Sequence, residues 1–546
     1  MKQKKIQLKK RIAKMKNYQI GLILAFVQSV ASYFYSCFFF NFDVDNVSAK
    51  QNKLLVDVLF FGIMFLAYWG LVWIVRNGKK YKPYIRFALV YFALLMTILI
   101  LVWPGVWRND DMGTAMMAKG YALDGWQHVL TSVFYMISYK LLPFYSGVII
   151  IQGAIIAIIS SYLYYSVLAN TSLKNRLVRV ILFIPFVLPP VLDNSLYPLR
   201  PILYSYLCVL LIFVMIKFIR LKKLSTLNLM FLVGLFVVCA GWRSEGIYLI
   251  VVAFIYFIYL AKKRLIMPFM LFVSLIGSFG GVLLVRQFEN SQLNQYSQMR
   301  YSLSSTVEIA APLIRKAHED NRVEDLEKID KVLNVDLVVG TNLSGEKVFW
   351  DDSGVRLFDA EEYGDYMKTL AKLILAYPGE VVSERLMEFE VTSALVDDEK
   401  NVIWDTTANY DGSSKERIQT FISSGGGIMN PISTRLRKAV IRILEGRDIY
   451  NYNNTIFTYP LFWNLLVPLF GIFAFVVWQF IRRRIAVALI VASILVKTVI
   501  VFLTAPGPYH MYYFAEYLLG YILVAYMVVS LVQRCFVVRR KAKTIK

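Results

Sequence analysis

The sequence predicts an all-α polytopic membrane protein with about twelve transmembrane helices and one external, mainly helical soluble insert. The first observation is composition, because 58% of the 546 residues are hydrophobic and the mean hydropathy is +0.53. A soluble domain of this length carries far more polar surface. The second observation is the series of long apolar runs, and the third is the way charged residues divide between the segments that separate them.

Twelve apolar runs approach the length of about 20 residues that a helix needs to cross a bilayer. They lie at residues 18–40, 54–75, 87–104, 144–168, 179–193, 199–219, 227–242, 247–261, 265–285, 459–481, 485–504 and 512–533. A further apolar stretch at 129–142 is too short to cross. We interpret it as a helix that lies on the membrane surface or re-enters the bilayer.

The distribution of charge predicts the orientation of the spans. Residues 1–16 contain eight Lys or Arg and no acid, and the apolar run that follows has no signal-peptide cleavage site. With the N-terminus in the cytoplasm and the spans alternating, the predicted cytoplasmic segments hold 32 Lys or Arg and no Asp or Glu. Both termini are therefore expected in the cytoplasm. The net charge of +23 reflects this bias and does not indicate nucleic-acid binding.

The spacing of the apolar runs divides the chain into three parts. An N-terminal membrane region covers 1–286, a large hydrophilic segment covers 287–455, and a C-terminal membrane region covers 456–546. The hydrophilic segment holds 28 Asp or Glu against 19 Lys or Arg, whereas the rest of the chain is strongly basic. Because positive charge is retained in the cytoplasm, this acidic domain is expected on the external side.

The hydrophilic segment itself carries helical periodicity. Apolar residues recur at helical spacing over 306–318, 323–333 and 363–395. Pro378 should end or kink the last of these helices. The three consecutive glycines within 423–427 predict a flexible loop.

A short loop at residues 103–128 holds the strongest candidate site. It reads Trp-Pro-Gly-Val-Trp-Arg-Asn-Asp-Asp over 103–111, directly after a predicted span. Two adjacent carboxylates at the mouth of a membrane span are costly unless they have a function. The candidate site residues of this loop are Arg108, Asp110, Asp111, Asp124 and His128.

Other predicted external loops carry side chains of the same kinds. A carboxylate can act as a general base toward an acceptor hydroxyl, and a guanidinium can bind phosphate oxygens through paired hydrogen bonds. Because the predicted topology puts these loops on the same side of the membrane, we expect them to contribute to one external site. The candidates that they add are Asp193, Arg200, Arg243, Glu245, Tyr509 and His510.

Each candidate also has a purely structural interpretation. Asp110 and Asp111 suit a solvated loop end or a helix N-terminus, and His128 suits a helix cap. The arginines suit span ends among lipid phosphates. The remaining structural alternatives are an Asp193–Arg200 pair, an Arg243–Glu245 pair, an interfacial anchor at His510 and, for Lys497 inside a predicted span, either snorkelling or pairing with an acid.

These loops resemble those of the GT-C glycosyltransferases, a superfamily of multi-spanning enzymes that use polyprenyl-phosphate sugars. The similarity lies first in an early external loop that begins Pro104-Gly105 and has an acid a few residues on. Residues 127–130, Gln-His-Val-Leu, resemble the family's His/Lys-Pro-Pro-Leu element but lack its prolines. Residues 192–200 and 242–246 are also similar to recurring loop elements of bacterial members.

The resemblance implies a GT-C-like fold and an inverting membrane glycosyltransferase of a bacterial plasma membrane. It implies Asp110 or Asp111 as the catalytic residue, and Arg200 or Arg243 as the residue that binds the donor phosphate. The donor would be a polyprenyl-phosphate sugar, and the acceptor a glycan, polymer or lipid of the cell envelope. Membrane lipid is a further expected partner. The positive charge beside the leaving phosphate would come from an arginine or from a divalent metal ion held by the acids.

Two other functions compete with this expectation. A polysaccharide polymerase or ligase also uses polyprenyl-linked sugars externally, but such enzymes rely on arginine-rich external loops without an early acidic pair. A lipid or sugar transporter, such as a flippase, is expected to carry ionisable residues at mid-membrane and broken helices in paired halves. Nearly all acids outside 287–455 lie at one predicted face, which favours chemistry at the membrane surface.

Overall fold

The structure is a computed structural model that describes residues 15–43, 45–171, 175–292, 294–341, 343–396, 415–425, 427–446 and 458–544. Within these ranges every regular element is a helix, and the β-type pairing is confined to an isolated bridge between Leu333 and Val355. The prediction of an all-α protein is therefore confirmed. The contacts within the chain divide it into two compact units, and each is described by itself.

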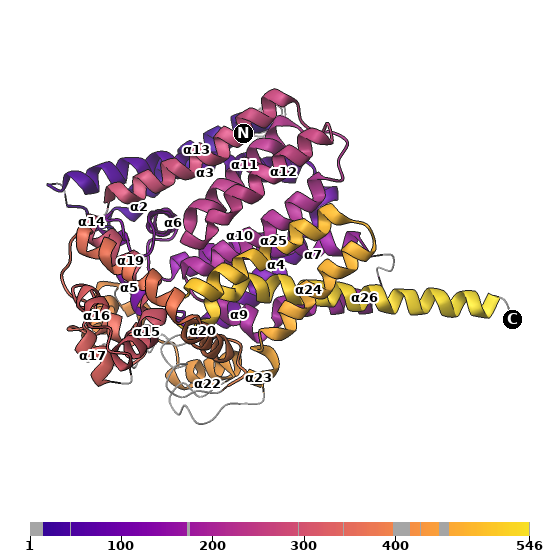
Figure 1. Cartoon of the computed structure of the whole chain (residues 1–546). Helices are drawn as coiled ribbons and strands as arrows, with labels where there is room; N and C mark the ends of the chain where they lie inside the picture. The colour runs from indigo at the N-terminus through magenta and orange to yellow at the C-terminus, as the bar shows by residue number, and fades with distance from the viewer. Residues whose placement is uncertain are drawn as a thin grey trace. The chain divides into compact units, whose positions relative to one another are not determined.

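The first unit comprises Met1–Arg179, Leu192–Leu203 and Thr407–Ile441. Its helices are α2 (Asn17–Ser36), α3 (Val47–Arg76), α4 (Gly78–Leu101), α5 (Asn109–Lys119), α6 (Val129–Leu141), α7 (Gly147–Ala169), α21 (Lys415–Gly425), η3 (Gly427–Met429) and α22 (Thr434–Glu445), which ends just past the unit boundary. Helices α2 and α3 pack along one another, as do α4 and α7 (Figure 1). Gly21 permits the first pairing, because a Cβ there would lie 2.9 Å from the backbone nitrogen of Trp69.

The second unit comprises Val180–Val191, Tyr204–Thr406 and Arg442–Lys546. Its helices are η1 (Ile184–Val187), α11 (Thr226–Trp242), η2 (Ser244–Ile247), α12 (Tyr248–Lys262), α13 (Pro268–Gln292), α14 (Gln295–Leu303), α15 (Val307–Glu319), α16 (Val323–Asp330), α17 (Val335–Gly340), α18 (Gly345–Trp350), α19 (Ala360–Ala376), α20 (Pro378–Thr392), α23 (Thr458–Phe462), α24 (Leu466–Ile481), α25 (Ile485–Thr504), η4 (His510–Tyr513) and α26 (Phe514–Thr544). Three further helices cross a unit boundary, namely α8 (Arg176–Phe183), α9 (Pro189–Ser195) and α10 (Arg200–Phe218).

Ten helical segments of the described ranges are long and apolar enough to cross a membrane, which supports a multi-pass membrane protein. Two of the twelve predicted spans differ from this set. Residues 227–242 form α11, whose 17 residues are short for a span. Residues 179–193 form α8, η1 and α9, which bend by 52° at a break next to Pro189. Proline explains the bend, because it lacks the N–H that continues a helix.

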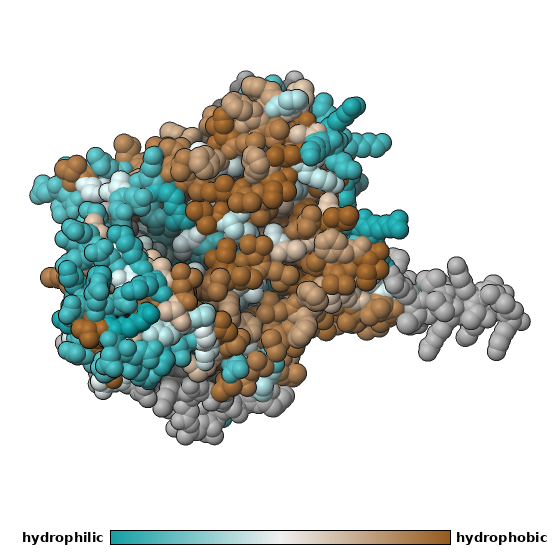
Figure 2. All heavy atoms as spheres, in the orientation of Figure 1, coloured by the Kyte–Doolittle hydropathy of each residue, from teal (hydrophilic) through white to brown (hydrophobic). Residues whose placement is uncertain are grey.

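The helices predicted for the hydrophilic segment are present in the second unit. The predicted ranges 306–318 and 323–333 correspond to α15 and α16, and 363–395 is divided into α19 and α20. Pro378 is the first residue of α20, where its missing N–H has no helical partner to lose. Figure 2 shows hydrophilic residues over α15–α19, whereas hydrophobic residues dominate the surface of α11–α13.

The glycine-rich stretch at 423–427, for which the sequence predicts a flexible loop, is partly helical in its described residues. Residues 423–425 end α21 and 427–429 form η3, while 426 lies outside the described residues. Ser424 holds the end of α21, because its hydroxyl bonds to that of Tyr145 at 2.8 Å and its carbonyl accepts a hydrogen bond from Nζ of Lys119 at 2.7 Å. Tertiary hydrogen bonds thus outweigh the local preference of glycine.

Candidate active site

The predicted acidic pair lies in the first turn of α5, where the helix dipole favours negative charge. Asp111 accepts a hydrogen bond from the backbone N–H of Arg108 at 3.3 Å, and it is only 2% exposed. Burial raises the pKa of the Asp111 carboxyl well above its usual range, against the opposing effect of the Arg108 charge. Asp111 therefore caps the helix from inside the protein.

Asp110 is exposed, in contrast to its neighbour. Its Oδ2 accepts a hydrogen bond from Nε2 of Gln127 at 2.6 Å. Because Gln127 is buried, its amide holds the carboxylate from the protein side. Of the two predicted catalytic aspartates, Asp110 is thus the one that solvent can reach.

Asp124 builds the turn between α5 and α6. Its Oδ2 accepts a hydrogen bond from the hydroxyl of Thr114 at 2.6 Å. Its Oδ1 accepts backbone N–H bonds from Trp126 at 3.0 Å and from Gln127 at 3.3 Å. Asp124 therefore fixes the backbone of Gln127, the residue that holds Asp110. Sequence reasoning did not single out Gln127 or Thr114, although Gln127 lies within the quoted element 127–130.

His128 closes the same turn as the N-cap of α6. Its φ of 72° lies in the left-handed region, which residues other than glycine rarely adopt. Its Nδ1 accepts a hydrogen bond from the backbone N–H of Leu130 at 3.3 Å, and the side chain is buried. His128 therefore caps α6, as its structural interpretation predicts.

The second predicted loop lies within segment 192–203, which belongs to the first unit and contacts helices α6 and α7. The hydroxyl of Tyr135, on α6, donates to the carbonyl of Pro198 at 2.9 Å. The side-chain amide of Gln152, on α7, donates to the carbonyl of Tyr197 at 2.6 Å. These two bonds hold the segment against the helices that follow the acidic loop.

Arg108 and Arg200 supply positive charge to this cluster. The Arg108 guanidinium lies 4.8 Å from the centre of the Tyr197 ring and interacts electrostatically with Asp111 and Asp193. Nη1 of Arg200 donates to the carbonyl of Trp126 at 3.2 Å, which joins segment 192–203 to the turn after Asp124. Asp193 is buried, and its Oδ1 has no hydrogen-bond partner among the described residues.

A segment from the hydrophilic part of the sequence packs on the same loop. Phe421, on α21, contacts Trp107 with ring centres 4.9 Å apart. Arg437, on α22, is buried and donates to the carbonyls of Val102 at 3.3 Å and Gly105 at 3.1 Å. The loop after α4 is therefore supported by residues more than 300 positions away, which sequence reasoning did not anticipate.

The other four candidates belong to the second unit. Arg243 pairs with Glu245, and its guanidinium also lies 5.3 Å from the centre of the Tyr512 ring. The hydroxyl of Tyr509 donates to Glu346. His510 is buried, and its Nε2 lies 3.3 Å from the hydroxyl of Tyr459. The Arg243–Glu245 pair named as a structural alternative is thus present, and the environment of His510 is protein rather than a membrane interface.

Lys497 pairs with an acid, as one of its two structural interpretations predicts. Its Nζ lies 3.0 Å from Glu516, and both side chains are buried. Lys497 therefore pairs within the protein and does not snorkel to the membrane surface. The two residues lie in α25 and in the apolar segment that contains α26.

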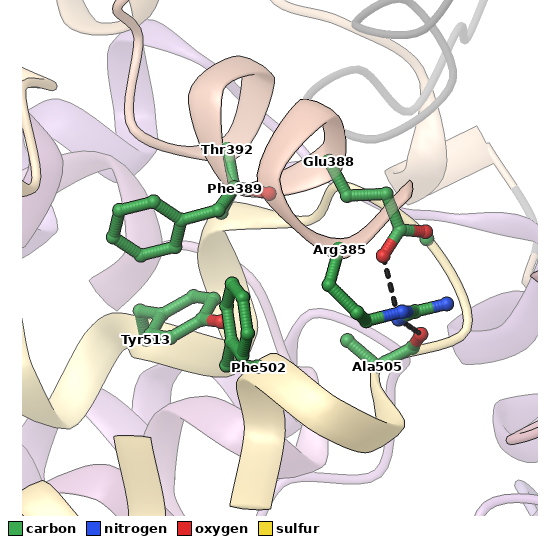
Figure 3. A pocket seen from close by; sticks show the side chains of 8 residues that line it. Arg385, Glu388, Phe389, Thr392, Phe502, Ala505 and Tyr513 are labelled. Atoms are coloured by element: carbon green, nitrogen blue, oxygen red, sulfur yellow. Dashed lines mark hydrogen bonds and ion pairs between the residues drawn. The ribbon is translucent and has the colours of Figure 1, made fainter. Parts of the chain in front are cut away.

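A small pocket of the second unit contains none of the candidates. It is lined by Arg385, Glu388, Phe389, Thr392, Phe502, Ala505, Gly507 and Tyr513 (Figure 3). Arg385 pairs with Glu388 at 2.6 Å and donates to the carbonyl of Ala505 at 2.8 Å. Burial, together with nearby glutamates, raises the pKa of Glu388 to about 9 despite the charge of Arg385.

The described residues contain no group of three or more His, Cys, Asp or Glu arranged to hold a metal ion.

No model of a known protein family, no curated protein and no solved structure matches this chain.

Proposed function

We propose that the protein is an integral membrane glycosyltransferase that moves a sugar from a polyprenyl-phosphate carrier to a cell-envelope acceptor on the external face. The observation that carries this proposal is the exposed carboxylate of Asp110. It lies nine residues after the end of span α4, is held by Gln127, and shares a cluster with two arginines. An external enzyme embedded in a bilayer needs a donor that is itself anchored in the membrane, and a polyprenyl carrier provides one.

The chemistry follows from the charges of this cluster. Asp110 takes the proton of an acceptor hydroxyl, whose oxygen attacks the anomeric carbon of the sugar. The bond from that carbon to the phosphate oxygen breaks, the anomeric configuration inverts, and polyprenyl phosphate leaves. Arg200 is the proposed group that stabilises the negative charge of the leaving phosphate. Asp111 has the lesser role of a helix cap.

The topology belongs to the same proposal. The 32 basic residues of the proposed cytoplasmic segments support two cytoplasmic termini and an external hydrophilic domain at 287–455. The bent pair α8–α9 and the short helix α11 would complete twelve membrane segments. Cytoplasmic nucleotide sugars cannot reach an external site, so this topology agrees with a lipid-linked donor of a bacterial plasma membrane.

One observation favours a second function, a lipid or sugar transporter. The Lys497–Glu516 pair is buried within two candidate spans, where ionisable residues often mark a transport pathway. The break at Pro189 is also a feature of transporter helices. A transporter would move the lipid-linked sugar without breaking its phosphate bond, so consumption of the donor separates the two functions.

The proposed activity is tested with membranes that contain the protein and a panel of radiolabelled polyprenyl-phosphate sugars. We expect wild type and Asp111→Asn to transfer label to an acceptor, and Asp110→Asn at the same protein level to lose transfer by about 100-fold or more. Asp45→Asn, an exposed acid outside the cluster, is the matched control. Full activity of Asp110→Asn would refute the catalytic assignment. Donor movement across the bilayer without consumption would favour the transporter.

A further inference from the structure

The stretch 415–445, which ends with helix α22, differs in charge from the rest of the hydrophilic segment. It contains six Lys or Arg and two Glu, whereas the whole segment 287–455 has an excess of acids. Three of the basic residues form one row along α22. Arg435, Lys438 and Arg442 recur at spacings of three and four, which places them on one side of a helix. Arg435 and Arg442 are exposed.

An apolar row runs beside this basic row. Leu436, Ala439 and Ile443 also recur at spacings of three and four, each one position after a basic residue. Leu436 is 43% exposed and Ile443 is 63% exposed, and Ile432, just before the helix, is 67% exposed. An exposed apolar row flanked by cations is the pattern of a helix that lies in a membrane interface.

The opposite side of α22 shows where the helix lies. Arg437 points inward and binds the carbonyls of Val102 and Gly105. Span α4 ends at Leu101, so these carbonyls belong to the first residues that leave the apolar helix. Nearby, the indole N–H of Trp103 donates to the carbonyl of Ile428 at 2.6 Å. All of these residues belong to the first unit, so the start of α22 packs against the residues that directly follow candidate span α4.

We propose that α22 is an interfacial helix whose exposed face binds the anionic lipid headgroups of the membrane that the protein spans. Leu436, Ala439 and Ile443 enter the boundary between headgroups and acyl chains, while Arg435, Lys438 and Arg442 meet lipid phosphates. Charge complementarity selects lipid over an apolar protein partner, because the basic row lies directly beside the apolar one. The inference is independent of the enzymatic activity proposed above.

The first test uses the full-length protein, with its four cysteines replaced by serine, in vesicles of phosphatidylcholine with or without phosphatidylglycerol. A fluorophore is attached at Ile443→Cys or, as control, at Leu375→Cys, which is an 84% exposed leucine on α19. We expect spin-labelled lipid to quench the probe at 443 and iodide in the buffer to quench the probe at 375. Quenching at 443 by iodide alone would overturn the proposal.

The second test needs no cysteine replacement. Hydrogen exchange of amides 434–445 in the wild-type protein should slow when phosphatidylglycerol is added to the vesicles. Each basic residue near an anionic surface strengthens binding by about fivefold, so Arg435→Gln/Arg442→Gln should remove most of this slowing. Lys368→Gln, an exposed lysine on α19, should leave it unchanged. Exchange that is equal in neutral and anionic vesicles would refute headgroup binding.

Discussion

The side-chain amide of Gln127 donates to Oδ2 of Asp110 over 2.6 Å. This bond fixes one oxygen of the exposed carboxylate, and Asp124 in turn fixes the backbone of Gln127. The candidate base is therefore oriented by a buried residue that does not itself need to touch a substrate. This arrangement makes Gln127 a positioning residue in the proposed mechanism.

Gln127→Leu should lower transfer through kcat. The substitution removes the donor but keeps a side chain of similar size, so we expect kcat to fall about tenfold with little change in KM. Steady-state kinetics with the active donor measures this. In an Asp110→Asn background the same change should have no further effect, whereas independent losses in the double variant would contradict the positioning role. Gln51→Leu, an exposed glutamine on α3, is the control.

Arg437→Gln should loosen the loop after α4. The variant weakens two hydrogen bonds from a buried guanidinium, and we expect a loss of about 2 kcal/mol in the stability of this region. Hydrogen exchange of amides 102–108 should become faster, while α11–α13 of the second unit stay unchanged. Arg435→Gln, on the exposed side of the same helix, should leave exchange of 102–108 as in the wild type.

Replacing one residue of the Lys497–Glu516 pair should lower the stability of the protein more than replacing both. Lys497→Met leaves a buried carboxylate without its cation, and the expected loss of stability is about 3–5 kcal/mol. Lys497→Met/Glu516→Leu removes both charges and should recover much of this loss. Thermal unfolding in detergent compares the variants. A double variant less stable than Lys497→Met would show that the pair has a further role.

Stability of the second unit should fall as pH rises through neutrality. The pKa of Glu388 is raised from 4.5 to about 9 by burial, so the folded chain keeps a proton that the unfolded chain has lost. Raising the pH between these two values therefore favours unfolding, and the effect ends above the higher one. The pKa of Glu308 is raised to about 7, in the same direction and also by burial.

Glu388→Gln tests this pH dependence. The amide carries no charge at any pH, so the variant should lose less stability than the wild type between about pH 5 and about pH 9. Melting temperatures in detergent over this interval provide the measurement. Glu390→Gln, on the exposed side of the same helix, should retain the wild-type profile. A wild-type profile for Glu388→Gln would contradict a proton held at this site.

Features encoded over short stretches of sequence were the ones that could be predicted. The boundary between α19 and α20 follows from Pro378, and the helices α15 and α16 follow from apolar periodicity. The acidic pair at the start of α5 was recognisable because two carboxylates follow a long apolar run. These signals are local, so they can be recognised in the sequence without knowledge of the fold.

Features that depend on contacts between distant segments could not be predicted. The bonds from Arg437 to Val102 and Gly105 cross more than 330 positions, and no local pattern marks an arginine that will turn inward. The helical conformation of residues 423–425 has the same cause, because Ser424 bonds to Tyr145 and Lys119. The sequence offered both possibilities for Lys497, and only the packing of α25 against η4 and α26 distinguishes them.

The support of the α4–α5 loop by Arg437 has a consequence for biosynthesis. A chain emerging from the ribosome presents Val102 to the membrane 335 residues before Arg437 is made. During that interval the loop lacks both hydrogen bonds that Arg437 donates, so the proposed catalytic loop is still incomplete when its neighbouring spans have been made. A chain truncated before α22 is therefore expected to lack the loop geometry that the proposed activity requires.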